Sequence, residues 1–198
     1  MVPFDLPFGS GIGIRRHLAS LTTVDGRAND GSIMTDASFV PDPANHRRLR
    51  EALGRFATGV CVVTTMVSDG PMGFTANSFA SLSLDPPLVL WSPAKASLRY
   101  PVFAAARHFA IHVLGVDQQD MMHRFGRGGA GFGGLVDVRT VEGIPVIPDT
   151  LARFDCLQHA THDGGDHLIV VGRVLRVAAR AGEPLVFSAG RYGGFAAG

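Results

Sequence analysis

Short runs of β-branched and apolar residues, separated by turn residues, constrain the fold of this chain more than any other feature. Four runs are the clearest: residues 60–67 (VCVVTTMV), 86–92 (PPLVLWS), 108–115 (HFAIHVLG) and 166–179 (DHLIVVGRVLRVAA). Runs of this length and composition are typical of strands. They do not alternate regularly with helical segments, which argues against a doubly wound parallel sheet. We therefore expect a mainly β fold, an antiparallel barrel with short helices.

Helical segments are few and short. Residues 42–59 (DPANHRRLREALGRFATG) predict a helix with Asp42 as N-cap, Pro43 at the first helical position and Gly59 at the end. Two more short helices are expected over residues 97–107 and 117–126. In the last of these Met121, Met122 and Phe125 provide packing residues, and Phe125 is placed at the border of a site.

The chain divides into an N-terminal extension and one folded domain. Residues 1–40 have no sustained hydrophobic period and predict a flexible extension; the alternative is a segment ordered by packing on the body or on a partner subunit. Their GSGIGI stretch lacks the preceding strand and following helix of a dinucleotide-binding loop. Organised structure is expected over residues 41–198, interrupted by a mobile glycine-rich loop at 126–134.

Charge and hydrophobicity narrow the possible partners. The formal net charge of the 198 residues is +1, so no global field attracts nucleic acid or anionic lipid. No apolar run is long enough to span a bilayer, and the N-terminus lacks the order of a secretory signal. Cys61 and Cys156 predict two free buried thiols in a reducing compartment. We expect a soluble, cytoplasmic protein.

Two polar clusters flank the strand at 86–92. The first, GFTANS, holds Gly73, Phe74, Thr75, Asn77 and Ser78. Its hydroxyl and amide groups suit the polar edge of a flavin ring, but on pattern alone a turn with local side-chain hydrogen bonds is the slightly better explanation.

The second cluster, WSPAKASLR, follows that strand. It contains Ser92, Ser97, Arg99 and Lys95, the only lysine beside 17 arginines. Hydroxyls, cations and free N–H groups at a helix start make an anion site. A solvated helix N-terminus is the alternative.

Two further motifs lie toward the C-terminus. HDGGDH at 162–167 predicts a hairpin with Asp163 and Gly164 as the bend. A metal site is a weaker alternative, because the spacing matches no common tetrahedral set by itself. In GRYGGF, Tyr192 could stack on a ligand or pack the end of the chain.

Seven segments taken in order resemble the flavin reductase family of the FMN-binding split-barrel fold, and most closely the reductase components of two-component flavin-dependent monooxygenases. They are FATGVCVVTT, GFTANSFASLSLDPPLVLWSPAKAS, FAIHVL, QQDMMHRFG, FDC, DGGDHLIVVGRV and PLVFSAGRY. The resemblance covers about Leu49 to Phe195. In one of these segments His112 stands where family members often carry Asn.

The resemblance implies a site. Flavin ring and ribityl contacts would come from the first cluster, and ribityl and phosphate contacts from the second, where Pro93 and Ala94 join the residues named above. Gly165, Asp166 and His167 match a segment linked to nicotinamide nucleotide binding, and Tyr192 matches an aromatic residue on the nicotinamide side. His167 is the catalytic candidate because it would position the nicotinamide, and no metal is expected.

The implied activity is an NAD(P)H:flavin oxidoreductase. Hydride would pass from NADH to FMN or FAD, and reduced flavin would go to a separate monooxygenase. A homodimer is expected from the family. Alternatives are a flavoprotein that keeps its FMN and reduces a corrinoid or iron, and a flavin- or haem-binding module without turnover. A metal-dependent hydrolase is the least favoured.

Overall fold

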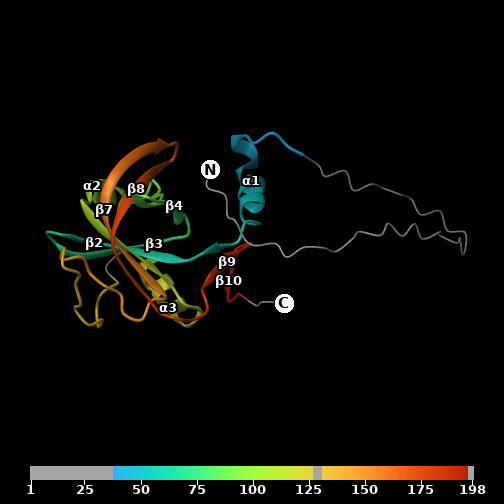
Figure 1. The fold of residues 1–198 in the computed structure, drawn as a ribbon. Coiled ribbons are helices and arrows are strands. Elements are labelled where there is room, and N and C mark those ends of the chain that lie inside the picture. Colours follow the sequence, from blue (N-terminus) through green and yellow to red (C-terminus); the bar gives the residue numbers. More distant parts are fainter. Residues whose placement is uncertain (1–37, 127–130, 196–198) are drawn as a thin grey trace, which may run out of the picture. The chain divides into compact units, whose positions relative to one another are not determined.

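Two antiparallel sheets carry the fold in the computed structural model, which describes residues 38–126 and 131–195 (Figure 1). The larger sheet has seven strands in the order β3-β2-β6-β7-β8-β5-β4, and the smaller has three in the order β1-β9-β10. The strands are β1 (Thr58–Gly59), β2 (Cys61–Val67), β3 (Gly70–Ala76), β4 (Ala80–Leu84), β5 (Pro87–Trp91), β6 (His108–Val113), β7 (Ala152–Gly164), β8 (His167–Ala179), β9 (Val186–Ser188) and β10 (Arg191–Gly193). The predicted mainly antiparallel β fold is confirmed.

The two edges of the large sheet are neighbours in sequence. β3 and β4 lie at opposite ends of the strand order and do not pair with each other in the described part of the chain, so the sheet stays open. The residues between them, 77–79, carry the chain from one edge to the other. Residues 73–84 alternate in sequence as one strand would, but the structure divides them between β3 and β4. The Ser78 hydroxyl forms hydrogen bonds with the backbone of Ser92. These bonds hold the connection in place, so β3 does not continue into β4.

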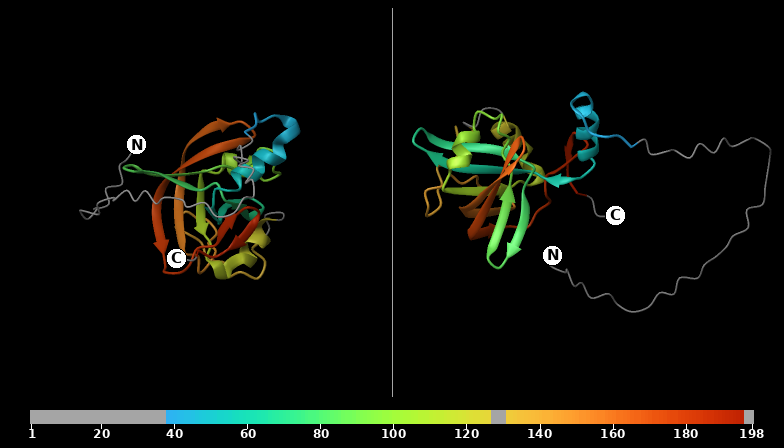
Figure 2. Two further views of the ribbon diagram at one scale, coloured as in Figure 1. Left: turned by 90° about the vertical axis from the view of Figure 1, so that its right-hand side faces the viewer. Right: turned by 90° about the horizontal axis from the view of Figure 1, so that it is seen from above.

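β7 and β8 form a long hairpin that curves around one side of the domain, as both views in Figure 2 show. Its bend is at Gly165 and Asp166, because Gly164 still pairs with His167 across the ladder. The predicted bend at Asp163 and Gly164 is therefore wrong by two residues. Gly165 has φ = 78°, a backbone conformation that glycine adopts without strain, so it takes the turn.

The core consists of two clusters of buried residues. One is formed mainly by strands of the large sheet and includes the tryptophan and two phenylalanines: Cys61, Val63, Ala76, Val89, Trp91, Phe103, Phe109, Ile111, Cys156 and Val170. The other joins the start of β2 to helix α3: Val60, Val62, Leu114, Met122, Phe125, Ile147 and Leu185. Met122 and Phe125 pack the helix as predicted.

The helices are short. α1 is His46–Leu53, α2 is Tyr100–Ala105 and α3 is Gln119–Gly126, with 3-10 turns at Pro43–Asn45 and Val116–Gln118. Asp42 caps the first turn as predicted. α1 ends at Leu53 with Gly54 as its C-cap, and not at Gly59. Ala189 N–H donates to the Gly54 carbonyl at 2.7 Å. This carbonyl therefore bonds to the C-terminal segment and does not take part in a further turn of the helix.

Several expectations concern residues at the margins of the described ranges. Residues 1–37 of the predicted extension and 127–130 of the predicted loop lie outside the residues that the structure describes, so the predicted domain division stays a prediction. Cys61 and Cys156 are both free and buried, as expected. Burial raises the pKa of each thiol to about 12. Among the described residues, no helix is long and apolar enough to cross a membrane.

Candidate functional site

The loop after β5 is bound to the tip of the β7–β8 hairpin. Lys95 Nζ donates to the Asp163 carboxylate and, at 2.6 Å, to the Gly165 carbonyl. Lys95 N–H donates to Asp166 O at 2.9 Å, and Leu168 N–H to Pro93 O at 3.1 Å. Hydrogen bonding from Lys95 holds the pKa of Asp163 below its usual range. The single lysine thus fixes the hairpin tip beside the second polar cluster.

His167 stands at this junction with a defined orientation. It forms an isolated bridge with Ala94, and its Nδ1 lies 2.7 Å from Asp166 Oδ1. Hydrogen bonding to His167 lowers the pKa of Asp166, which is therefore an acceptor. Nδ1 then carries the ring proton, and Nε2 of the neutral ring is available to accept a hydrogen bond. The His167 side chain is half-exposed, so a ligand can reach it.

The two polar clusters meet through a pair of serines. Ser92 N–H donates to Ser78 Oγ at 2.9 Å, and the Ser78 hydroxyl lies 3.2 Å from Ser92 O. Ser78 belongs to the connection between the sheet edges, and Ser92 follows β5. Segments that are 14 residues apart in sequence therefore form one polar surface.

Arg99 joins the start of α2 to β3 and α3. Its guanidinium donates to Gly73 O at 3.0 Å and to Phe125 O at 2.7 Å, and it lies 4.4 Å from the centre of the Phe74 ring. Ser97 Oγ accepts from Arg99 N–H at 3.2 Å. Most of the donor capacity of Arg99 is used by the protein itself. Arg99 thus sets the relative positions of the first and second clusters.

Thr75 and Asn77 line a small cavity of about 150 Å³ together with Tyr192. The Thr75 hydroxyl donates to Met122 O at 2.8 Å, which leaves its oxygen lone pairs available. The Asn77 amide makes no hydrogen bond to another described residue. Phe187 and Tyr192 form an aromatic wall, with ring centres 4.8 Å apart. A polar planar ring would find both amide and aromatic partners in this cavity.

Phe125 lies behind the site and not on its surface. Its ring is fully buried and packs edge-on against Phe132 at 4.9 Å between ring centres. A side chain at position 73 would meet this ring, since a Cβ on Gly73 would lie 2.2 Å from Phe125 Cδ1. Gly73 and Phe125 therefore shape the cluster without offering their side chains to a ligand.

Sequence reasoning missed Phe187 and the anchoring role of Asp163. Phe187 gave no signal beyond a place in a strand-like run. Asp163 did have a signal in the sequence: the chain has a single lysine, and a half-buried lysine needs an acidic partner. Within residues 38–126 and 131–195, no three His, Cys, Asp or Glu side chains lie close enough together to hold a metal ion.

Known proteins resemble this chain in both sequence and fold. The family model described as "Flavin reductase like domain" matches residues 53–196. The FMN reductase (NADH) SmoA of Agrobacterium fabrum is 59% identical over 157 residues, which cover 79% of this chain and 90% of that protein. The HsaB reductase subunit of a flavin-dependent monooxygenase from Rhodococcus jostii is 40% identical over 161 residues, covering 80% and 83%.

Among solved structures, the NADH:FAD oxidoreductase SgcE6 of Streptomyces globisporus C-1027, in complex with NAD and FAD fragments, superposes with a TM-score of 0.73. It is 38% identical in sequence, and the match covers 80% of this chain and 98% of that one.

Proposed function

Because the chain belongs to the flavin reductase-like domain family, we propose that it transfers hydride from NADH to FMN or FAD and supplies the reduced flavin to a separate monooxygenase. The likeness to an NADH-dependent FMN reductase over most of both chains supports the reaction. HsaB is named as the reductase subunit of a flavin-dependent monooxygenase, and this supports a monooxygenase as the separate partner. The observation that carries the proposal in this chain is the joining of the two polar clusters through Ser78 and Ser92, with the hairpin tip bound beside them at Lys95.

The residues of the site fit a flavin. The free amide of Asn77, the lone pairs of Thr75 and the aromatic wall of Phe187 and Tyr192 suit a planar ring with a polar edge. Serine hydroxyls from 92–97 suit the ribityl chain and phosphate, while the N–H groups of Ser92, Lys95 and Ser97 already bond within the protein. The cations Lys95 and Arg99 are already engaged with protein acceptors, so we propose that they act mainly by holding the phosphate loop in shape.

When bound, the flavin supplies the chemistry by accepting a hydride from the dihydronicotinamide ring of NADH. The protein contributes orientation and exclusion of water. Asp166 fixes the tautomer of His167, so that Nε2 accepts a hydrogen bond from the nicotinamide carboxamide. Tyr192 provides an aromatic surface for the ring stack. No side chain needs to give or take a proton in the hydride step.

We propose a homodimer, supported by helix α1, which buries none of its residues against the described domain. Leu53 is 66% exposed and the following Phe56 is 79% exposed, and a second copy would cover both. A cytoplasmic location is supported by the two free, buried thiols.

The test is NADH consumption by the purified full chain in air, without flavin and then with added FMN or FAD. Turnover that rises with free flavin supports the reductase and its role as a supplier of reduced flavin. Turnover by a coloured protein without added flavin would favour an enzyme that keeps FMN and reduces another acceptor. No turnover with any flavin, with NADPH tried as well, would contradict the proposal and leave a binding module.

A further inference from the structure

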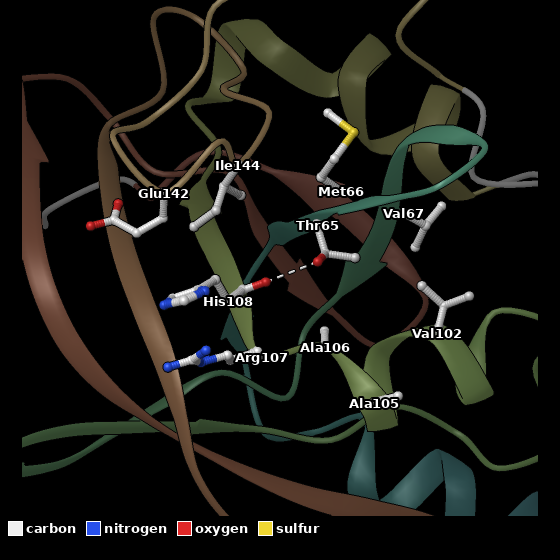
Figure 3. A pocket seen from close by; sticks show the side chains of 10 residues that line it. All are labelled: Thr65, Met66, Val67, Val102, Ala105, Ala106, Arg107, His108, Glu142 and Ile144. Atoms are coloured by element: carbon white, nitrogen blue, oxygen red, sulfur yellow. Dashed lines mark hydrogen bonds between the residues drawn. The ribbon is translucent and has the colours of Figure 1, made fainter.

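A second cavity lies away from the site described above. It has a volume of about 320 Å³ and shares no residue with the cavity beside Asn77 or with the loop around Lys95. Four segments line it: the end of β2, the C-terminal half of α2, the start of β6 and the loop before β7 (Figure 3). Cavities of this size hold small organic molecules.

One side of the cavity is apolar. Met66 and Val67 come from β2, and Val102 and Ala105 come from α2, whereas Ile144 of the loop before β7 lies beside Glu142. Val67 and Val102 are only partly buried, so a ligand could still cover apolar surface. In Figure 3, Met66, Val67 and Val102 lie on one side of the view, and the ionisable side chains lie on the other.

The ionisable side has an unbalanced positive charge. The Glu142 carboxylate is partly buried and accepts from both terminal nitrogens of Arg176 at 2.8 Å. Burial opposes ionisation of Glu142, but hydrogen bonds from its own N–H and from Thr140, with the charge of Arg176, outweigh it and lower its pKa. Glu142 is thus an anion already neutralised by a partner outside the cavity lining.

Arg107 has no such partner. Its backbone carbonyl accepts from Gln158 N–H at 2.9 Å, but its guanidinium makes no hydrogen bond or ion pair with another described residue. The side chains of Arg107 and His108 extend in the same direction from the start of β6 (Figure 3). The Thr65 hydroxyl, 2.8 Å from His108 O, anchors this end of the strand.

We propose that this cavity binds a small carboxylate with an apolar body. Arg107 would take the carboxylate through charge-assisted hydrogen bonds, with His108 beside it, and the ring or alkyl body would lie against Val67, Val102 and Ile144. Because Glu142 is paired with Arg176, its carboxylate in the cavity wall does not repel the carboxylate of the ligand.

The probe is sodium benzoate, with benzylamine as a cation of matched size. Titration of the isotopically labelled full chain, followed by amide NMR shifts, should give saturable benzoate binding centred on Val67, Val102 and Ile144. A Kd on the order of 1 mM is expected for so small a ligand. Benzylamine should not saturate. Absence of saturable benzoate shifts, or equal binding of both probes, would overturn the proposal.

Two variants separate the charge from the cavity. Arg107→Gln should weaken benzoate binding about tenfold, and Ala105→Leu should block it by filling the apolar side. Arg55→Gln removes an exposed arginine outside the cavity and should change nothing. NADH turnover should be unchanged in all three variants, since none of these residues belongs to the flavin site, and this also checks folding. Benzoate binding unaltered by Arg107→Gln would also overturn the proposal.

Discussion

Single side chains set the orientation of the reacting groups. His167 has one nitrogen committed to Asp166 and the other available to a ligand. Replacing the ring by a methyl group removes the acceptor for the nicotinamide carboxamide but leaves the flavin clusters intact. His167→Ala is therefore expected to raise the KM for NADH severalfold, and the KM for flavin much less.

The check is steady-state kinetics with each substrate varied in turn. His162→Ala is the matched control, since His162 lies on the same hairpin, is exposed, and is not expected to touch a ligand. An unchanged KM for NADH in His167→Ala would remove His167 from the site.

A different histidine determines how stability depends on pH. His112 is fully buried, with Nδ1 3.2 Å from Val62 O and Nε2 accepting from Ile147 N–H at 3.2 Å. Burial lowers its pKa to about 3, against the opposing effect of the Val62 carbonyl. The unfolded chain therefore takes up the proton first as the pH falls below about 6.5. The His112 contribution to stability is complete above that pH and is lost progressively between pH 6.5 and 3.

Urea unfolding measures this contribution. Between about pH 6.5 and pH 5, His112 alone should lower the free energy of unfolding by up to about 2 kcal/mol. The variant His112→Asn lacks the titrating ring, so its free energy of unfolding should fall less over the same range. Equal losses in the two proteins would show that His112 is not the group responsible.

At the scale of elements, helix α3 packs on β3 through one glycine. Phe125 of α3 occupies the space beside Gly73, so a methyl group there must displace the ring or the strand. Gly73→Ala should lower stability by about 1–3 kcal/mol, the usual range for overpacking. It should also weaken flavin binding, because Arg99 bonds to the carbonyls of both residues.

Thermal unfolding and flavin titration test this packing. Gly59→Ala is the control, since a Cβ there would meet nothing within 4 Å. The double variant Gly73→Ala/Phe125→Leu should recover part of the loss by making room for the added methyl group. A Gly73→Ala protein as stable as the control would contradict the tight packing of α3 on β3.

The elements differ in how well sequence predicts them. β2, β5 and β6 were readable because short β-branched runs end at turn residues. The break between β3 and β4 was not, since 73–84 keeps a strand-like pattern through the connection. Its cause is a hydrogen bond between Ser78 and Ser92, a tertiary contact that no local pattern contains. The end of α1 was not predicted for the same reason, because it depends on a tertiary contact between Gly54 and Ala189.

Site residues followed the same rule. The two polar clusters were visible as local composition, and the resemblance to flavin reductases assigned them to one ligand. The clusters meet through Ser78 and Ser92, and the second cluster is joined to the tip of the β7–β8 hairpin across about 70 residues. The cavity at Arg107 was not foreseeable, because each of its four segments contributes ordinary residues.

At the scale of the whole molecule, the exposed end of α1 determines the expected assembly. Leu53→Asp with Phe56→Asp should convert the proposed dimer to monomers, because two charges would have to be buried in the interface. Sedimentation equilibrium of the full chain gives the mass directly. Val141→Asp is the control, since Val141 is 86% exposed on a different segment. A wild-type protein that sediments as a monomer would contradict the homodimer.

The solitary lysine has a consequence for proteolysis. An endoprotease that cleaves only after lysine has a single target in the chain, between Lys95 and Ala96, and would divide the protein into two fragments of nearly equal length. That bond lies in the loop that the flavin phosphate would occupy, and the lysine is held by the hairpin tip. The rate of one cut thus reports whether this loop is closed, and ligands that occupy the site should slow it in proportion to their occupancy.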